Sequence, residues 1–396
     1  MAIDASETPA RSFRAVSRVL MTADSVGPQW NQTLDLSRAL ATHGVEVVLL
    51  SLGRRLTQEQ HRAAWSIPSL SVYEEPLRAE WMEDPWSDVR RAGEVLLQLE
   101  ERYRPDVVHL NAAANAVLPF RAPVIVHAQV CALAYWRAVY GSASPGHLEV
   151  YRERVGAGLR RADMVVASTA SGLRELAAEY GPFRDARVIF PGCDPESYVP
   201  DVKEELVFSA GRLWDPGRNL GALAGVSEAI PWPIYLADDE QRAPASTSTV
   251  RLLNPGGMRN QGKLSRAALA SWFGRAAIYV QPGRYEPSGL AVLEAACSGC
   301  ALVLADIPSL RELWEDVAVF VAPDDHAQLR AALQTLIHER SSREALAHAA
   351  YERARTLTSL QSGARHHALY AELSARSDAQ AWARSSKSGG SESALL

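Results

Sequence analysis

Two glutamates eight positions apart, Glu286 and Glu294, are the residues whose type and spacing suggest chemistry most directly. Glu286 follows an apolar run through a Pro-Gly turn, and Glu294 lies in a segment with helical character that begins near Ser288. On one continuous helix the two side chains would point about 80° apart, so they face one ligand only if Glu286 lies on the preceding loop. A loop carboxylate, the free N–H groups of a helix N-terminus and a second carboxylate can together bind a phosphorylated sugar. The alternative is an N-cap serine followed by a solvated glutamate.

A second segment, Gly211–Asn219, places Arg212 and Arg218 directly after a predicted strand. Two guanidinium groups at this spacing can hold a diphosphate through charge-assisted, bidentate hydrogen bonds. They stabilise a departing diphosphate increasingly as it gains charge in the transition state. The alternative is a surface loop with two solvated arginines. The position of the segment upstream of the glutamate pair favours the diphosphate clamp.

Length and composition indicate a globular protein of two domains, or three at most. The chain has 396 residues, of which 47% are hydrophobic and 22% are charged. The net charge of −5 argues against a nucleic-acid partner. Four cysteines do not make a disulfide framework, no apolar run is long enough to span a bilayer, and the N-terminus lacks a signal-peptide core. We therefore expect a cytoplasmic location, with peripheral attachment to the inner face of a membrane left open.

Short β-branched runs alternate with helical patterns, which predicts an α/β fold with parallel sheets and helices on both faces. The pattern pauses at the polar segment 194–203 and restarts, which predicts two doubly wound domains with a ligand-binding cleft between them. We expect the first domain at residues 1–200, the second at 201–358, a helix at 359–384 and a disordered Ser/Gly-rich tail at 385–396. The strands predicted for the first domain are Arg18–Met21, Val45–Leu50, Val107–Leu110, Val124–His127, Met164–Ala167 and Val188–Phe190. Those predicted for the second domain are Leu206–Ala210, Ile234–Ala237, Val250–Leu253, Ile278–Val280, Leu302–Ala305 and Val319–Val321.

In this order the segments resemble glycosyltransferase family 4, whose members are retaining enzymes with the two-domain GT-B fold. The resemblance runs from about Arg18 to Tyr370 and is carried mainly by Gly211–Asn219, by Arg284–Glu294 with its E-x7-E spacing, and by Gly299–Leu313. It implies transfer of a sugar from a nucleotide diphosphate sugar, most commonly a UDP-sugar, to a glycan, lipid-linked or small-molecule acceptor, with no cofactor and no metal. It also implies front-face displacement, in which the acceptor hydroxyl attacks on the side that the diphosphate leaves. The last helix is expected to cross back to the first domain.

The resemblance assigns a role to each charged residue of the two segments. Arg212 and Arg218 would bind the diphosphate, although the family more often has lysine at the second position. Glu286 would contact the transferred sugar, and Glu294 would accept hydrogen bonds from the ribose.

The remaining assignments concern uncharged groups. Backbone N–H groups of Gly289 and Leu290 would face the donor phosphates beside Ser288, which stands where relatives often have phenylalanine. His127 closes a predicted strand at a place where the family has a histidine near the donor sugar, and the alternative is a satisfied core histidine. Gly27 lies in an N-terminal loop where relatives often have two adjacent glycines, but here a proline follows it. The predicted catalytic residues are therefore Glu286, His127 and Arg212; the predicted donor-binding residues are Arg212, Arg218, Ser288, Gly289, Leu290, Glu294 and Gly27.

Other interpretations stay open at this point. Asp238-Asp239-Glu240, after a strand, can be interpreted as the metal-binding acidic motif of GT-A glycosyltransferases. Cys297 and Cys300 are spaced as C-x-x-C, but no second pair completes a zinc site, and two buried residues fit better. The chain can also be another GT-B enzyme, such as a glycan synthase, a phosphorylase or a sugar-nucleotide epimerase. A non-catalytic sugar-nucleotide-binding protein is the alternative outside enzymes, and turnover of a donor separates the two.

Overall fold

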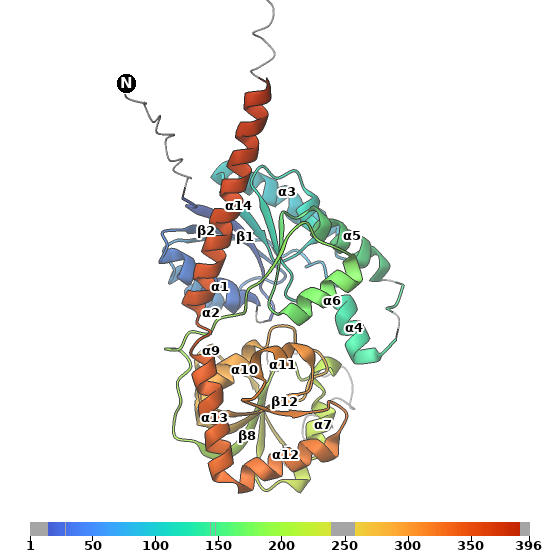
Figure 1. The fold of residues 1–396 in the computed structure, drawn as a ribbon, viewed down its shortest axis with the longest axis vertical. Coiled ribbons are helices and arrows are strands. Elements are labelled where there is room, and N and C mark those ends of the chain that lie inside the picture. The colour runs from blue at the N-terminus through green and yellow to red at the C-terminus, as the bar shows by residue number, and fades with distance from the viewer. Residues whose placement is uncertain (1–14, 28, 143, 147, 239–257, 389–396) are drawn as a thin grey trace, which may run out of the picture.

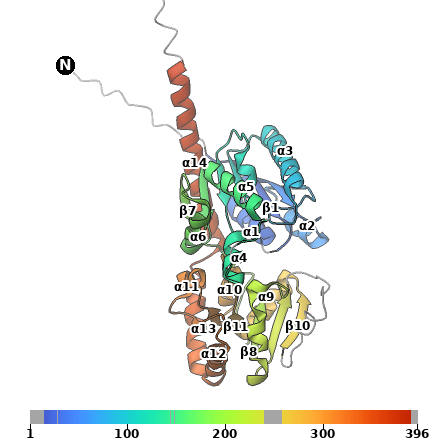
Figure 2. The ribbon, with the colours of Figure 1, turned by 90° about the vertical axis from the view of Figure 1, so that its right-hand side faces the viewer.

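The computed structural model describes residues 15–27, 29–142, 144–146, 148–238 and 258–388. Within these residues two α/β domains lie one after the other along the long axis of the molecule, and a long last helix runs beside the first domain (Figure 1, Figure 2). Each domain is built on one parallel sheet. The predicted fold class is confirmed.

The first sheet has seven parallel strands in the order β3-β2-β1-β4-β5-β6-β7. The order reverses between β1 and β4, which is where doubly wound sheets bind ligands beyond the carboxyl ends of their strands. The sequence did not predict β3, because this edge strand is only half-buried and lacks a continuous apolar run. The strands are β1 (Arg18–Asp24), β2 (Glu46–Leu52), β3 (Leu70–Glu74), β4 (Val107–Leu110), β5 (Val124–His127), β6 (Met164–Ala167) and β7 (Ala186–Val188).

Helices cover both faces of this sheet, so its central strands are buried on both sides and consist of apolar runs. Alternate residues of a strand enter different cores: Leu20 packs with residues of α3, α5 and α6, whereas Val19 and Met21 pack with residues of α1 and the last helix. The helices are α1 (Gln29–Ala41), α2 (Gln58–Trp65), α3 (Trp86–Tyr103), α4 (Ala132–Tyr140), α5 (Leu148–Arg161) and α6 (Ala170–Tyr180).

The second sheet has six parallel strands in the order β10-β9-β8-β11-β12-β13, again with a reversal at its centre. Its strands are β8 (Glu204–Ala210), β9 (Ile234–Asp238), β10 (Met258–Lys263), β11 (Ala276–Gln281), β12 (Ala301–Ala305) and β13 (Val319–Val321). The edge strand β10 was not predicted, since its sequence is mostly polar. The strand predicted at Val250–Leu253 lies outside the described residues.

Six α-helices of the second domain are described: α7 (Leu220–Ala224), α9 (Arg266–Arg275), α10 (Leu290–Cys297), α11 (Pro308–Trp314), α12 (His326–His338) and α13 (Arg340–Ala354). Asp325 caps α12 by accepting a hydrogen bond of 2.8 Å from the backbone N–H of Gln328. Cys297 and Cys300 are both buried and unpaired, which confirms the interpretation of the C-x-x-C spacing as two core residues. None of the helices in the described part of the chain is both long and apolar enough to cross a bilayer.

The last helix, α14 (Ser359–Ser388), crosses back to the first domain as predicted. Leu369, Tyr370 and Leu373 are buried in the core of that domain. Gly363 permits close packing on α1, because a Cβ at this position would lie 2.3 Å from the Cβ of Ala39. The helix continues to Ser388, so residues 385–388 are helical and not part of a tail; each added residue of a formed helix gains a backbone hydrogen bond. Residues 389–396 lie outside the described residues.

Candidate active site

Glu286 lies at the centre of the second-domain site, on the loop between β11 and α10. Its carboxylate is buried and accepts hydrogen bonds from four residues on its two oxygens. Oε2 accepts from Arg218 Nη1 at 2.7 Å and from Gln281 Nε2 at 2.9 Å, and Oε1 accepts from the backbone N–H of Gly289 at 3.0 Å and from Ser288. Burial alone would raise the pKa of Glu286, but Arg218 and the N–H of Gly289 outweigh it and hold the pKa below its usual value. Glu286 is therefore an ionised acceptor at neutral pH.

The helix after this loop begins at Leu290, two residues later than the sequence suggested. Gly289 is the N-cap, with a φ of +65°, and α10 starts at Leu290. The left-handed conformation favours glycine here and turns the N–H of Gly289 toward Glu286. Ser288 does not cap the helix; its hydroxyl lies 3.3 Å from Glu286 Oε1. In this structure the glutamate thus occupies the N–H group of Gly289 that we had assigned to a donor phosphate.

The two arginines follow β8. Gly211 has a φ of +144°, and a Cβ there would lie 2.9 Å from Arg218 Nε, so the glycine leaves room for the Arg218 side chain. Asp215 holds the loop by accepting a 2.8 Å hydrogen bond from the backbone N–H of Gly217. Arg212 stands 5.9 Å over the Trp214 ring and near Asp24 of the first domain. The segment therefore presents both guanidinium groups on the side of the second domain that faces the first.

Glu294 lies inside α10 in a different environment. Its carboxylate is buried and accepts a hydrogen bond of 2.7 Å from the hydroxyl of Tyr198. Burial raises the pKa of Glu294 to about 7, although Tyr198 and the charge of Arg266 act in the opposite direction. One glutamate of the pair is thus firmly ionised, whereas the other titrates near neutral pH.

Tyr279 lies within electrostatic range of both glutamates. It is fully buried on β11, and burial raises its pKa. The charges of Arg218, Glu286 and Glu294 all act on its hydroxyl. The structure thus brings these three predicted residues around one side chain of the central strand.

A polar pocket of about 50 Å³ forms the first-domain wall of the site, at the carboxyl ends of β4 and β5. His109, His127 and His366 line it, with ring centroids 5.6–5.7 Å apart, and each has a buried Nε2 atom without a hydrogen-bond partner. Burial lowers the pKa of His127 to about 3 and that of His366 to about 4, and it lowers the pKa of His109 as well. All three imidazoles are therefore neutral at neutral pH. Other polar lining residues are Gln32, Thr33, Asp35, Asn111, Gln129, Ser168, Ser359 and Ser362.

Gly27 follows β1 with a φ of +82°, and a Cβ there would meet no atom within 4 Å. The next residue, Pro28, lies outside the described residues. Before Gly27, the buried carboxylate of Asp24 accepts hydrogen bonds from the N–H of Val26 at 2.9 Å and the indole of Trp81 at 2.9 Å. Burial raises the pKa of Asp24 even though Arg212 lowers it. The β1 loop and the arginine segment therefore face each other.

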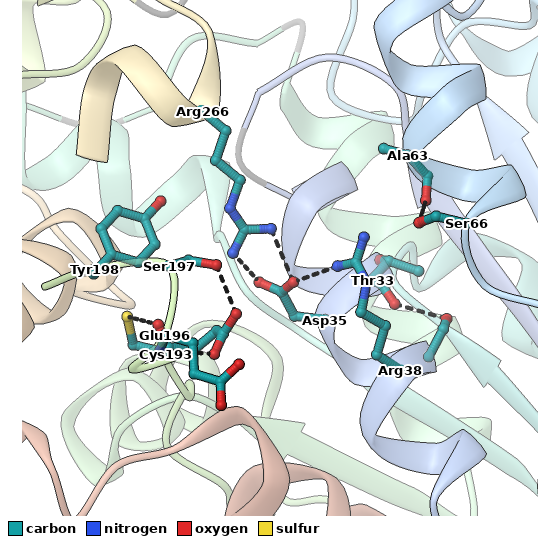
Figure 3. A network of polar contacts seen from close by, with 12 residues as sticks. Thr33, Asp35, Arg38, Ala63, Ser66, Cys193, Glu196, Ser197, Tyr198 and Arg266 are labelled. Carbon is teal, nitrogen blue, oxygen red and sulfur yellow. Dashed lines mark hydrogen bonds and ion pairs between the residues drawn. The ribbon is translucent and has the colours of Figure 1, made fainter. Parts of the chain in front are cut away.

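Hydrogen bonds also join the two domains at several places within the described residues, among them the Cys131 backbone N–H to the Tyr285 hydroxyl at 3.1 Å. Tyr135 donates to Asp215 at 2.6 Å, and Glu312 of α11 accepts from the backbone N–H groups of Ala170 and Ser171 at 2.7 and 2.9 Å. Arg266 forms two hydrogen bonds with Asp35 (Figure 3). These contacts hold the side of the second domain that carries the predicted donor residues against the first domain.

The acidic segment after β9 is described only in part. Asp238 ends β9, and one of its oxygens lies 3.4 Å from the backbone N of Leu213. Asp239 and Glu240 lie outside the described residues. Across the described ranges, no three His, Cys, Asp or Glu side chains are arranged to hold a metal ion.

Comparisons with known families agree with this division of the chain. The model described as Glycosyltransferase Family 4 matches residues 29–197, and the model described as Glycosyl transferases group 1 matches residues 224–353. The two matches follow each other and correspond to the two domains. Together the two matches indicate a glycosyltransferase of the family 4 type.

Relatives of this glycosyltransferase include the D-inositol 3-phosphate glycosyltransferase of Nocardiopsis dassonvillei, which is 29% identical over 234 residues. That match covers 50% of this chain and 53% of the relative. The glycogen synthase of Mycobacterium tuberculosis is 36% identical over 94 residues, which is 23% of each chain. The chain thus matches about half of the first relative's length and less than a quarter of the second's.

Solved structures place the glycosyltransferase among proteins of the same fold. Sucrose-phosphate synthase from Thermosynechococcus elongatus superposes with a TM-score of 0.75 at 18% identity, over 90% of this chain and 99% of that one. Anabaena HepE, solved with UDP and glucose, superposes with a TM-score of 0.68 at 15% identity, over 90% of this chain and 100% of that one. At these identities the likeness establishes the GT-B fold alone.

Sequence patterns did not indicate several residues that complete the site. Tyr198 lies in the segment predicted as a linker. Arg266 is the first residue of α9, and Asp35 lies in the middle of α1, so neither stands in a motif of its own. His366 lies on α14, far in sequence from the two strand-end histidines. Only the strand-end position of His109 and His127 gave a signal for the pocket.

Proposed function

We propose that this glycosyltransferase moves a sugar from a nucleotide diphosphate sugar, with UDP-sugars as the first donors to test, to a hydroxyl acceptor with retention of configuration. The observation that carries the proposal is the placement of one ionised carboxylate, one carboxylate that titrates near neutral pH and two guanidinium groups at the edge of one sheet. A structural neighbour, HepE, was solved with UDP and glucose, which supports a uridine nucleotide as the first donor to test.

In this proposal Arg212 and Arg218 bind the donor diphosphate. Arg218 leaves or shares its contact with Glu286 when the diphosphate arrives, because both ligands are anionic oxygen acceptors. Glu286 then accepts hydrogen bonds from hydroxyls of the transferred sugar, and Glu294 accepts hydrogen bonds from the ribose. The backbone N–H groups of Leu290 and its neighbours at the start of α10 add the positive end of a helix to the phosphate side.

The chemical step in this proposal is front-face displacement without a metal or cofactor. The bond between the anomeric carbon and the diphosphate oxygen breaks as the acceptor oxygen approaches on the same face. The departing phosphate oxygen takes the acceptor's proton, so the protein needs no general base. Its contribution is positioning and stabilisation of the charge that develops on the diphosphate.

His127 has a defined part in this scheme. Because burial lowers its pKa to about 3, the imidazole stays neutral and acts by hydrogen bonding, not by charge. All three imidazoles of the pocket are neutral, so this wall suits uncharged hydroxyl groups better than charged ones. We therefore infer that the acceptor offers a neutral polyol face to this wall. One relative is named for D-inositol 3-phosphate, a polyol derivative, which agrees with this class.

The reaction is assigned to the cytoplasm in this proposal, with no nucleic-acid partner. Acceptors that are glycans, lipid-linked sugars or small molecules remain the classes to screen. If the acceptor is lipid-linked, the protein should co-float with vesicles that contain it in a density-gradient flotation assay. Protein that stays in the dense fraction favours a free acceptor.

The first experiment measures thermal stability of the wild type and of Glu294→Ala with UDP, GDP, ADP and their sugar conjugates. A rise in melting temperature with one nucleotide, lost in the variant, identifies the donor base. Product analysis by nuclear magnetic resonance then gives the anomeric configuration, and activity in a chelator tests metal independence. Donor turnover without an acceptor would favour an epimerase. Binding without any turnover would favour a non-catalytic sugar-nucleotide-binding protein.

A further inference from the structure

Asp35, Arg266 and Tyr198 link the first domain to the carboxylate of Glu294. Figure 3 shows Asp35, Arg266 and Tyr198. Arg266 is the first residue of α9 in the second domain, and Asp35 lies on α1 of the first. Arg266 Nη1 donates to Asp35 Oδ1 at 2.9 Å, and Nη2 donates to Oδ2 at 2.7 Å. This is a bidentate pair between planar groups, the geometry in which arginine and carboxylate bind each other most specifically.

The pair is not a freely solvated surface bridge. The side chains of Arg266 and Asp35 are 27% and 14% exposed. Asp35 also accepts a hydrogen bond of 2.8 Å from Arg38, one turn along α1, which fixes the carboxylate on its own helix. The first domain thus offers a preorganised acceptor, and only Arg266 has to be positioned for the two domains to join.

On its other side, Arg266 reaches Tyr198. The guanidinium carbon lies 5.8 Å from the centroid of the Tyr198 ring, within the range of a cation–π contact. Tyr198 is 2% exposed and belongs to the segment that joins the two domains. Its hydroxyl donates to Glu294 Oε1 at 2.7 Å. One continuous set of contacts therefore runs from α1 through α9 and the interdomain segment to α10.

The charges of this set also act on Glu294 directly. Arg266 lowers and Asp35 raises the pKa of the Glu294 carboxyl, so both lie within electrostatic range of it. Asp35 in addition lines the histidine pocket. The same aspartate thus belongs to the first-domain wall and influences the carboxylate assigned to the ribose.

We propose that Asp35, Arg266 and Tyr198 are positioning residues that couple closure of the interdomain cleft to the orientation of Glu294 for the donor ribose. The proposal rests on the proposed function in assigning the ribose to Glu294. None of the three needs to touch the reacting atoms. When the domains close, the Asp35–Arg266 pair forms, Arg266 settles over the Tyr198 ring, and Tyr198 holds one oxygen of Glu294 so that the other faces the nucleotide.

The test compares nucleotide affinity and steady-state kinetics in Tyr198→Phe, Asp35→Asn and the exchanged pair Asp35→Arg with Arg266→Asp. Tyr198→Phe removes only the hydroxyl, and we expect it to weaken binding of the nucleoside diphosphate about tenfold, the usual effect of one hydrogen bond to a charged group. Asp35→Asn should weaken binding several-fold. Both should raise KM while changing kcat less than about twofold, because the bonds that break and form are elsewhere.

One further variant, together with the exchanged pair, separates positioning from mere stability. Glu204→Gln removes the Arg275–Glu204 pair, which joins the other end of α9 to β8 inside the second domain. It should leave KM unchanged whatever it does to the melting temperature. The exchanged pair should restore the radius of gyration of the wild type but not its nucleotide affinity, because it restores opposite charges across the cleft but removes the guanidinium from the Tyr198 ring.

The expected outcome has a structural counterpart without any ligand. Small-angle scattering of the ligand-free protein should give a larger radius of gyration for Asp35→Asn than for the wild type and for Glu204→Gln. Unchanged nucleotide affinity in both Tyr198→Phe and Asp35→Asn would overturn the proposal, as would a loss confined to kcat. If the wild type binds none of UDP, GDP and ADP, the proposed function fails. In that case the coupling is tested by small-angle scattering alone. Equal radii of gyration for Asp35→Asn and the wild type would overturn the coupling.

Discussion

Glu294→Gln should make the protein more stable at alkaline pH while weakening its binding of nucleotide. The folded protein holds the Glu294 carboxyl with a pKa of about 7, above the ordinary value of 4.5, mainly because the group is buried. A carboxyl whose pKa is raised by folding favours the folded state while it is protonated. Its contribution is therefore complete below about pH 4.5 and is lost as the pH rises through 7.

The size of this loss follows from the two pKa values. At 1.36 kcal/mol for each pH unit between 4.5 and about 7, the ionised carboxylate destabilises the fold by about 3 kcal/mol above pH 8. Glutamine resembles the protonated acid, because its amide oxygen can accept the hydrogen bond from Tyr198 and it carries no charge. The variant should thus match the wild type near pH 5 and exceed it by up to about 3 kcal/mol near pH 8.5.

Differential scanning calorimetry at several pH values checks this prediction. At each pH, the free energy of unfolding of the variant is compared with that of the wild type. The change of this difference with pH is the result to read, because any constant effect of the substitution cancels. Glu315→Gln, which neutralises an exposed carboxylate of the same domain, serves as the control and should give a difference that is flat with pH. A flat difference for Glu294→Gln as well would refute the reasoning. Nucleotide titrations in buffers of different ionisation enthalpy should also detect proton release near pH 7 in the wild type alone.

Other predictions concern single contacts of the site and of α14. Glu286→Gln should lower turnover at least about 100-fold in a radiolabelled-donor assay, because the charge that Arg218 and the sugar hydroxyls require is gone; retained turnover would contradict the assigned role. Because burial lowers the pKa of His366 to about 4, acidification from pH 6.5 to 4 should cost the wild type about 3 kcal/mol of stability through this histidine. His366→Gln should lose less stability over the same range, and denaturation midpoints at both pH values measure the difference. Gly363→Ala should lower the free energy of unfolding by about 1–3 kcal/mol, because the added Cβ would force α14 away from Ala39. Limited proteolysis should then release α14 sooner than in Ala364→Ser, a change on the exposed face, and equal cleavage rates would count against this packing argument.

The fold could be predicted from sequence wherever strands are buried on both faces. Ala301–Ala305 is fully buried, so every position is apolar and the run is unmistakable. The edge strands Leu70–Glu74 and Met258–Lys263 gave no such run, because one side or one edge of each faces solvent. The predictable part of the fold is therefore its buried centre.

The same reasoning explains which site residues could be found. Glu286 and Gly289 stand three positions apart, so a local pattern records their contact. Asp35 and Arg266 are 231 positions apart, and neither lies in a pattern of its own. Tyr198 looked like part of a polar linker because only the folded chain brings its hydroxyl to Glu294. Contacts of this kind depend on how the two domains meet, which short-range spacing does not encode.

The contacts across the cleft share a property that bears on how the enzyme opens. Each one attaches to an element that carries part of the donor site: Tyr135 bonds Asp215 in the arginine segment, and Arg266 lies beside the partner of Glu294. Glu312 lies on α11, where Ser309 donates a hydrogen bond of 2.6 Å to the carbonyl oxygen of Glu286.

No single one of these hydrogen bonds is strong, since a typical hydrogen bond contributes about 0.5–1.5 kcal/mol net and one to a charged group about 1.5–3. They connect rigid elements, however, so they form and break together when the domains move as bodies. Opening the cleft would then loosen the arginine segment, the Glu286 loop and the Tyr198–Glu294 contact in one step. If the proposed function holds, the complete donor site therefore exists only while the domains are closed and water is excluded.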